Sequence, residues 1–167
     1  MTQQPGQPDV DADLTSVRLD VTVALSRERA FRVFTEQFDR IKPREHNLLQ
    51  VDIAQTVLEP RTGGRVYDIG TDGSECHWGR VLAFEPPQRL LLAWLIGTRW
   101  QLETDPDRAS EVEVLFVENG PAETRVELEH RHLERHGDGW EQSHSALASG
   151  GGWPLYLHRF TDLAGSA

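Results

Sequence analysis

Cysteine and lysine are nearly missing from this sequence of 167 residues. Cys76 is the only cysteine, so no internal disulfide can form and nothing points to an oxidising compartment. Lys42 is the only lysine, and the arginines are scattered along a chain whose formal charge is −10. Because proteins bind duplex nucleic acid and anionic membranes through clustered cationic side chains, we expect neither as a partner.

Long apolar runs are missing too. The longest, Leu90 to Ile96, is far shorter than the roughly 20 residues that span a bilayer. The stretch 1–13 is polar, and it lacks the basic and apolar regions of a secretory signal. We therefore expect a cytoplasmic protein with a disordered tail over residues 1–13 and a single domain over residues 14–167.

The common motifs for nucleotide binding and nucleophilic catalysis do not occur. The glycines at 150–152 lack the Lys-Ser/Thr pair that completes a phosphate-binding loop, and there is no serine nucleophile elbow. Cys76 adjoins His77, but neighbours on a strand point to opposite faces, which favours a structural cysteine. We expect no cofactor.

Histidine is the one metal-ligating residue type that clusters. His130, His132 and His136 form the pattern H-x-H-x-x-x-H, and two imidazoles on one strand face with a third nearby are able to hold zinc. The spacing matches no established zinc pattern, so we favour a sheet edge that runs into a polar loop and expect no metal. His130 alone is the better candidate for a polar group inside a cavity.

The sequence does have a clear order of strand and helix patterns. Apolar residues at every second position from Val17 to Val23 predict a strand with one buried face. Ser26 is a good N-cap, and apolar residues at 31, 34, 38 and 41 predict a helix over 27–40. Pro43 ends or interrupts that helix.

Six further strands follow from short apolar runs separated by turns that contain glycine and proline. They are expected over residues 51–59, 65–69, 76–85, 89–96, 111–118 and 123–132. The polar stretch from Gly97 to Ser110 is interpreted as a long loop. Because short turns join antiparallel neighbours, the order of elements predicts an α+β domain.

The C-terminal part is expected to be helical in two segments. Residues 140–148 form the first, and the glycines after it weaken or break the helix, since each costs about 1 kcal/mol in a helix interior. Pro154 suits the first turn of the second segment. There Trp153, Leu157 and Phe160 lie on one apolar stripe.

Several short motifs, taken in order, resemble a known family. They are Gly63-Gly64, Asp72-Gly73, Gly79-Arg80-Val81, Glu85-Pro86-Pro87, Leu90, Trp94, Thr124-Arg125-Val126-Glu127-Leu128 and Gly152-Trp153 with Leu157 and Phe160. Over residues 14–164 the chain is similar to the family named after the C-terminal domain of the heat-shock protein 90 ATPase activator. That family belongs to the START-like superfamily, with pollen-allergen and polyketide-cyclase relatives. The resemblance implies a helix-grip fold, in which a curved antiparallel sheet of six to seven strands wraps around a C-terminal helix and leaves a cavity.

Aromatic residues supply most of the candidate ligand site, because ligand cavities are mostly apolar with a few polar groups that fix orientation. The expected lining residues are Tyr67, Trp78, Arg80, Trp94, Trp100, Phe116, His130, Trp153 and Leu157. Trp100, in the long loop, is a candidate lid. On a regular strand Arg80 shares the face of Trp78, where its cation would hold a ligand carboxylate. The alternatives are core filling for the tryptophans and a surface position for the arginine.

Three functions stay open. The favoured one is a non-enzymatic protein, monomer or homodimer, that binds a small apolar or aromatic ligand between the sheet and the last helix. The resemblance also implies a chaperone-regulating interaction domain that uses the outer face of the sheet. The third is a cyclase- or lyase-type enzyme, which needs a hydrogen-bonded histidine or carboxylate deep in the cavity. Asp68 and Glu75 flank a hairpin and are expected to be solvated.

Overall fold

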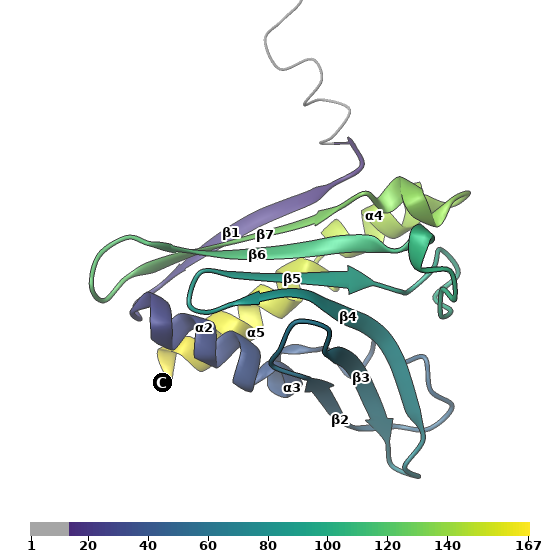
Figure 1. Ribbon diagram of the computed structural model, residues 1–167, viewed down its shortest axis with the longest axis horizontal. Coiled ribbons are helices and arrows are strands. Elements are labelled where there is room, and N and C mark those ends of the chain that lie inside the picture. Colours follow the sequence, from purple (N-terminus) through teal and green to yellow (C-terminus); the bar gives the residue numbers. More distant parts are fainter. Residues whose placement is uncertain (1–13) are drawn as a thin grey trace, which may run out of the picture.

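The computed structural model describes residues 14–167, so the predicted tail over 1–13 lies outside the described residues. Within the described part, seven strands form one antiparallel sheet in the order β1-β7-β6-β5-β4-β3-β2. The strands are β1 (Val17–Val23), β2 (Ile53–Leu58), β3 (Arg65–Gly70), β4 (Glu75–Glu85), β5 (Arg89–Trp94), β6 (Ser110–Glu118) and β7 (Thr124–Arg131). Figure 1 shows this sheet curling around α5 (Trp153–Gly165), with α2 (Arg27–Glu36) and α3 (Phe38–Ile41) beside that helix. The predicted α+β helix-grip fold is confirmed.

Alternation along the strands decides which side chains reach the helix. In β7, Val126, Leu128 and His130 are buried, while the residues between them are half-buried. In β6, Val114 and Phe116 are buried in the same way. Removing this apolar face from water stabilises the fold by about 25 cal/mol per Å².

The helix predicted over 27–40 is two helices. Ser26 caps the first, because its Oγ accepts a hydrogen bond of 3.3 Å from the backbone N–H of Arg29. Gln37, with φ −110° and ψ 24°, leaves the helical conformation, and α3 begins at Phe38. The predicted apolar stripe is buried on both helices.

A β-bulge in β4 turns Arg80 away from the face that holds Trp78. Val66 of β3 lies opposite Gly79, and the pairing shifts before the next pair, which leaves Trp78 as the extra residue. Trp78 is therefore buried while Arg80 is exposed. The prediction that both share one face assumed a regular strand, and the bulge corrects it.

The C-terminal helical region is interrupted as predicted. After α4 (Trp140–Ala148), α5 begins at Trp153 with Pro154 in its first turn. At Gly152, between the two helices, an added Cβ would lie 2.2 Å from the carbonyl oxygen of Leu147. Only a residue without a side chain lets the backbone pass this close to α4. No helix within residues 14–167 is long and apolar enough to cross a membrane.

Candidate functional site

Four of the predicted lining residues pack against one another between the sheet and α5. The ring of Trp94 lies at the centre, 5.2 Å from that of Trp78, 5.5 Å from that of Trp153 and 5.1 Å from that of His130. All four side chains are buried. The space in which we expected a cavity is therefore occupied here by the protein's own rings.

The other predicted lining residues lie in three different places. Phe116 and Leu157 are buried in the same core. Tyr67 lies on the outer face of the sheet, where its ring stacks on His77 at 4.5 Å. Arg80 is exposed, and Trp100 stands beside an open pocket.

That open pocket has a volume of about 370 Å³, within the usual range for small-molecule sites. It lies where the loop after α3, the loop after β5 and the break between α4 and α5 meet. Its lining residues are Glu45, His46, Asn47, Leu48, Ile96, Trp100, Ala146, Leu147, Ser149 and Gly151. Its walls are mostly apolar, as an aromatic ligand requires.

Trp100 is held at the pocket by its own short loop. The backbone N–H of Gly97 donates to the Gln101 carbonyl at 2.7 Å, and that of Trp100 donates to the Gly97 carbonyl at 3.0 Å. The φ of Trp100 is +57°, an uncommon conformation for a residue with a side chain. Its indole stays 41% exposed, 6.0 Å from the ring of His46. An exposed aromatic ring in a strained backbone conformation beside a pocket is consistent with ligand contact.

His46 forms part of the pocket wall and is fixed from below by Tyr156. The two side chains share a hydrogen bond of 3.1 Å between His46 Nδ1 and the Tyr156 hydroxyl. Burial lowers the pKa of His46, and the nearby Lys42 ammonium lowers it further, so the ring is neutral at pH 7. Burial raises the pKa of Tyr156 far above its usual value.

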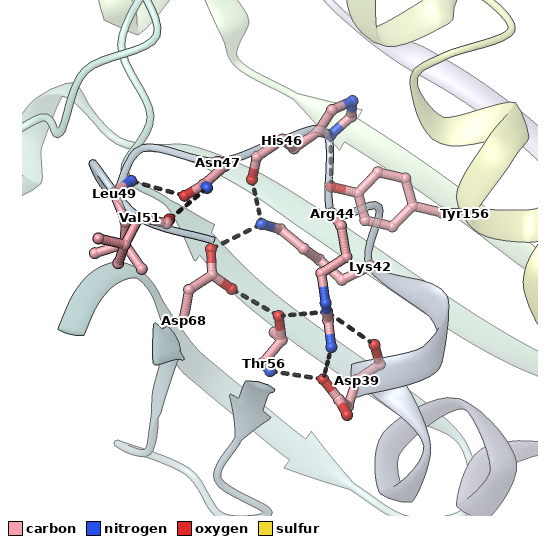
Figure 2. A network of polar contacts seen from close by, with 10 residues as sticks. All are labelled: Asp39, Lys42, Arg44, His46, Asn47, Leu49, Val51, Thr56, Asp68 and Tyr156. Atoms are coloured by element: carbon pink, nitrogen blue, oxygen red, sulfur yellow. Dashed lines mark hydrogen bonds and ion pairs between the residues drawn. The ribbon is translucent and has the colours of Figure 1, made fainter. Parts of the chain in front are cut away.

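A buried ion pair between Lys42 and Asp68 holds the loop that carries His46 against the inner face of the sheet. Lys42 Nζ lies 2.7 Å from Asp68 Oδ2, and both side chains are 1% exposed. Lys42 also donates to the carbonyl of His46 and lies 5.5 Å above the Trp78 ring. The second oxygen of Asp68 accepts a 2.7 Å hydrogen bond from the Thr56 hydroxyl. Figure 2 shows Lys42 between Asp68 and the His46 carbonyl.

The burial of Asp68 corrects the prediction that it is solvated near a hairpin. Asp68 lies on the inward face of β3, between the buried Val66 and Gly70. Lys42 directly follows the buried Ile41. The buried neighbours of each residue were the available signals in the sequence, but the pair itself could not be predicted because 26 positions separate its members.

A second polar cluster lies inside the core and is closed to the pocket. The Trp153 Nε1–H donates to His130 Nδ1 at 3.0 Å. The Ser110 hydroxyl lies 2.7 Å from His130 Nε2 and 2.7 Å from His136 Nε2. Because indole is only a donor, the neutral His130 carries its proton on Nε2 and donates it to Ser110. Burial places the pKa of His130 well below its ordinary value.

The histidine pattern does not form a metal site in the described part of the chain. His132 adopts a left-handed backbone conformation, with φ +63°, so the strand ends before it. His130 and His136 bind Ser110 instead. Within residues 14–167 no three histidine, cysteine or acidic side chains are grouped as ligands for an ion.

Comparisons with known proteins identify relatives along nearly the whole chain. The family model for "Activator of Hsp90 ATPase homolog 1-like protein" matches residues 24–165. A solved anthrahydroquino-gamma-pyrone synthase, Txn09, complexed with SUM, is 45% identical; the match covers 89% of this chain and 96% of that one, with a TM-score of 0.62. The self-sacrificing resistance protein CalC from Micromonospora echinospora is 30% identical over 92% of this chain and 97% of its own, with a TM-score of 0.66.

A more distant structure supports the fold alone. Protein NE0264 from Nitrosomonas europaea is 15% identical over 92% of this chain and 96% of its own, with a TM-score of 0.65. A search of curated proteins finds no match.

Proposed function

The chain belongs to the activator of Hsp90 ATPase homolog 1-like family, and from this premise we propose that it binds a planar polycyclic aromatic molecule and closes an oxygen-containing ring on it. The observation that carries the proposal is the 45% identity, over 89% of this chain, to an anthrahydroquino-gamma-pyrone synthase. The expected binding site is the pocket beside Trp100 rather than the space between sheet and helix.

The pocket supports this proposal by its size and its walls. Leu48, Ile96 and Leu147 offer apolar surface, and the Trp100 indole offers an aromatic face. Aromatic rings prefer offset-stacked or edge-to-face contacts, which suit a flat fused-ring ligand. His46 is the titratable ring beside this surface and is able to contact a ligand oxygen.

The ring closure needs no oxidant, no reductant and no co-reactant. When a phenol oxygen adds to an unsaturated ketone of the same molecule, a C–O bond forms at the carbon β to the ketone and the conjugated carbon–carbon π bond is lost. The phenol loses a proton, and the carbon next to the ketone gains one. The developing charge on the ketone oxygen is stabilised by a fixed hydrogen-bond donor. A neutral imidazole held by a buried partner fits this requirement.

The first test measures binding and ring closure with a matched pair of variants. A hydroxylated anthraquinone is titrated while tryptophan fluorescence is recorded, and a derivative with an unsaturated ketone side chain is followed by its absorption spectrum. We expect Trp100→Ala to weaken binding about tenfold, since the lost aromatic contact is worth about 1.4 kcal/mol. Tyr67→Ala removes an aromatic ring from the outer face and should leave the affinity unchanged. Equal effects from both variants, or no binding by the wild type, would contradict the proposal.

CalC is a resistance protein and not a synthase by its name, and the similarity to it favours a second candidate, in which the chain binds its ligand without closing a ring on it. Ligand recovered unchanged from the absorption experiment, at full occupancy of the pocket, would select this candidate. The cytoplasmic location and a chaperone partner stay predictions.

A further inference from the structure

We propose that the Nε2–H of His46 is the hydrogen-bond donor that holds a ligand oxygen in the pocket, and that the Tyr156 hydroxyl fixes the imidazole tautomer that carries this proton. The inference rests on the proposed function, because it names the group that meets a quinone or ketone oxygen of the aromatic ligand. Tyr156 acts here as a positioning residue.

The buried hydroxyl of Tyr156 has a single hydrogen-bond partner among the described residues. Its side chain is fully buried in α5, and within residues 14–167 its one hydrogen bond is the 3.1 Å contact with His46 Nδ1. Burial holds the pKa of Tyr156 so high that the hydroxyl keeps its proton at any ordinary pH. A buried hydroxyl needs an acceptor, and His46 Nδ1 is the acceptor within reach.

The two neutral tautomers of His46 satisfy this contact differently. With the proton on Nε2, the bare Nδ1 accepts from the Tyr156 hydroxyl and no buried proton is left over. With the proton on Nδ1, the ring donates to the tyrosine oxygen, and the hydroxyl proton is buried without an acceptor. An unsatisfied buried donor is strongly disfavoured, so the hydrogen bond selects the Nε2–H tautomer.

The second nitrogen of the His46 ring, Nε2, is not the one that Tyr156 binds. Figure 2 shows it turned away from Tyr156 and from the other labelled residues. His46 lines the pocket together with Gly151, and a hydrogen bond to the Gly151 backbone raises the pKa of the ring. Because His46 lines the pocket, we infer that a ligand oxygen there takes up the Nε2 proton or shares it with the Gly151 backbone.

The donor is fixed at both ends of its residue. Lys42 Nζ binds the His46 carbonyl, while Tyr156 binds the ring. Burial, Lys42 and Arg159 lower the pKa of His46, while Glu45 and the Gly151 carbonyl raise it. Because a neutral ring offers one proton and no charge, it matches an uncharged carbonyl oxygen better than a carboxylate.

The tautomer is tested first, without any ligand. Long-range proton–nitrogen correlation spectra of the ¹⁵N-labelled protein at pH 7.5 distinguish a protonated Nε2 from a protonated Nδ1. We expect His46 to show a protonated Nε2, and Tyr156→Phe to move its two nitrogen signals toward a mixture of tautomers. A protonated Nδ1 in the wild type, or an unchanged pattern in Tyr156→Phe, would overturn the inference.

The donor role is tested by adding the ligand to the same sample. On titration with a hydroxylated anthraquinone, the Nε2–H signal of His46 is expected to shift together with the Trp100 indole N–H. His46→Phe should weaken binding about tenfold, the usual effect of one hydrogen bond. His46→Gln, which keeps a side-chain N–H, should recover part of the loss. His158→Phe is the matched control, because His158 is exposed on α5 and should bind as the wild type does.

The possible outcomes separate the inference from the proposed function. If the Trp100 signal shifts while His46 stays unchanged, the inference fails and the pocket assignment stands. If no pocket signal shifts, the proposed function fails and the donor role fails with it. The wild-type titration needs no substitution, so a folding defect in a variant does not affect the conclusion about the donor role or about the proposed function.

Discussion

His46 and His130 are bound in the same way by one helix, yet they differ in what their second nitrogen meets. Trp153 and Tyr156 lie three positions apart on α5, and each bonds the Nδ1 of a histidine that belongs to a different part of the chain. For His130 the remaining Nε2–H is taken up by Ser110 inside the core. For His46, which lines the pocket, the remaining nitrogen is turned away from Tyr156 and from the other residues drawn in Figure 2.

This difference shows how one arrangement serves either packing or recognition. Around His130 each step from Trp153 to His136 is a short hydrogen bond between buried groups, so both ring nitrogens of His130 are already bound within the protein. On the other side, the hydrogen bond from Tyr156 leads to His46, a residue that lines the open pocket. A buried histidine is thus a poor marker of function until the partner of each ring nitrogen is known.

The largest effect on the free energy of unfolding is expected from the Lys42–Asp68 ion pair, which supports the loop that carries His46. Replacing Lys42 by methionine leaves the Asp68 carboxylate buried without its counter-charge, which should lower the free energy of unfolding by about 3 kcal/mol or more. Urea denaturation monitored by tryptophan fluorescence measures the loss. Arg125→Met breaks the exposed pairs with Asp20 and Glu127 and should cost about 1 kcal/mol or less. Similar losses for both variants would show that burial does not set the contribution of the Lys42 pair.

A smaller effect on the unfolding free energy is expected from the titration of His130 in the core. Burial is the main cause that lowers the pKa of His130, with His136 and His144 adding to it, so the native ring stays neutral where the unfolded chain takes up a proton. The contribution is complete above pH of about 6.5 and is lost as the pH falls below it, by at most about 1.4 kcal/mol per pH unit. His130→Gln should therefore flatten the decline of the unfolding free energy between about pH 6.5 and 5, as measured by urea denaturation. An unchanged slope would show that groups other than His130 cause the loss of stability in acid.

The smallest effect is expected at Arg80, on the face opposite the core cluster. Because the bulge exposes this side chain, Arg80→Ala should change the free energy of unfolding by about 0.5 kcal/mol or less. The affinity for a neutral anthraquinone and for one that bears a carboxylate should both stay unchanged, as calorimetric titration would show. A loss confined to the carboxylated ligand would restore the role that the sequence predicted for this arginine.

Much of the fold was readable because it rests on local patterns. The period of two from Val17 to Val23, the turns between strands and the glycines before Pro154 each predicted the element that is found. The bulge at Trp78 was not readable, because a glycine inside a strand pattern does not say which neighbour becomes the extra residue.

The candidate site was less accessible to sequence reasoning. Most residues expected to line a cavity are indeed inside, but volume decides whether they enclose a space or fill it, and no residue pattern gives that volume. The contacts between Lys42 and Asp68, and between His46 and Tyr156, join positions 26 and 110 residues apart. Such pairs follow from the assembled sheet and helix rather than from any spacing along the chain.

The missing side chain at Gly152 has a consequence for redesign of this protein. Since the backbone there touches the end of α4, even a methyl group would push that helix outward and displace Ala146 and Leu147, which face the pocket. Ligand size is therefore better adjusted by exchanging residues on α4 itself, where the volume of the opening changes while the tryptophan-filled interior keeps its shape.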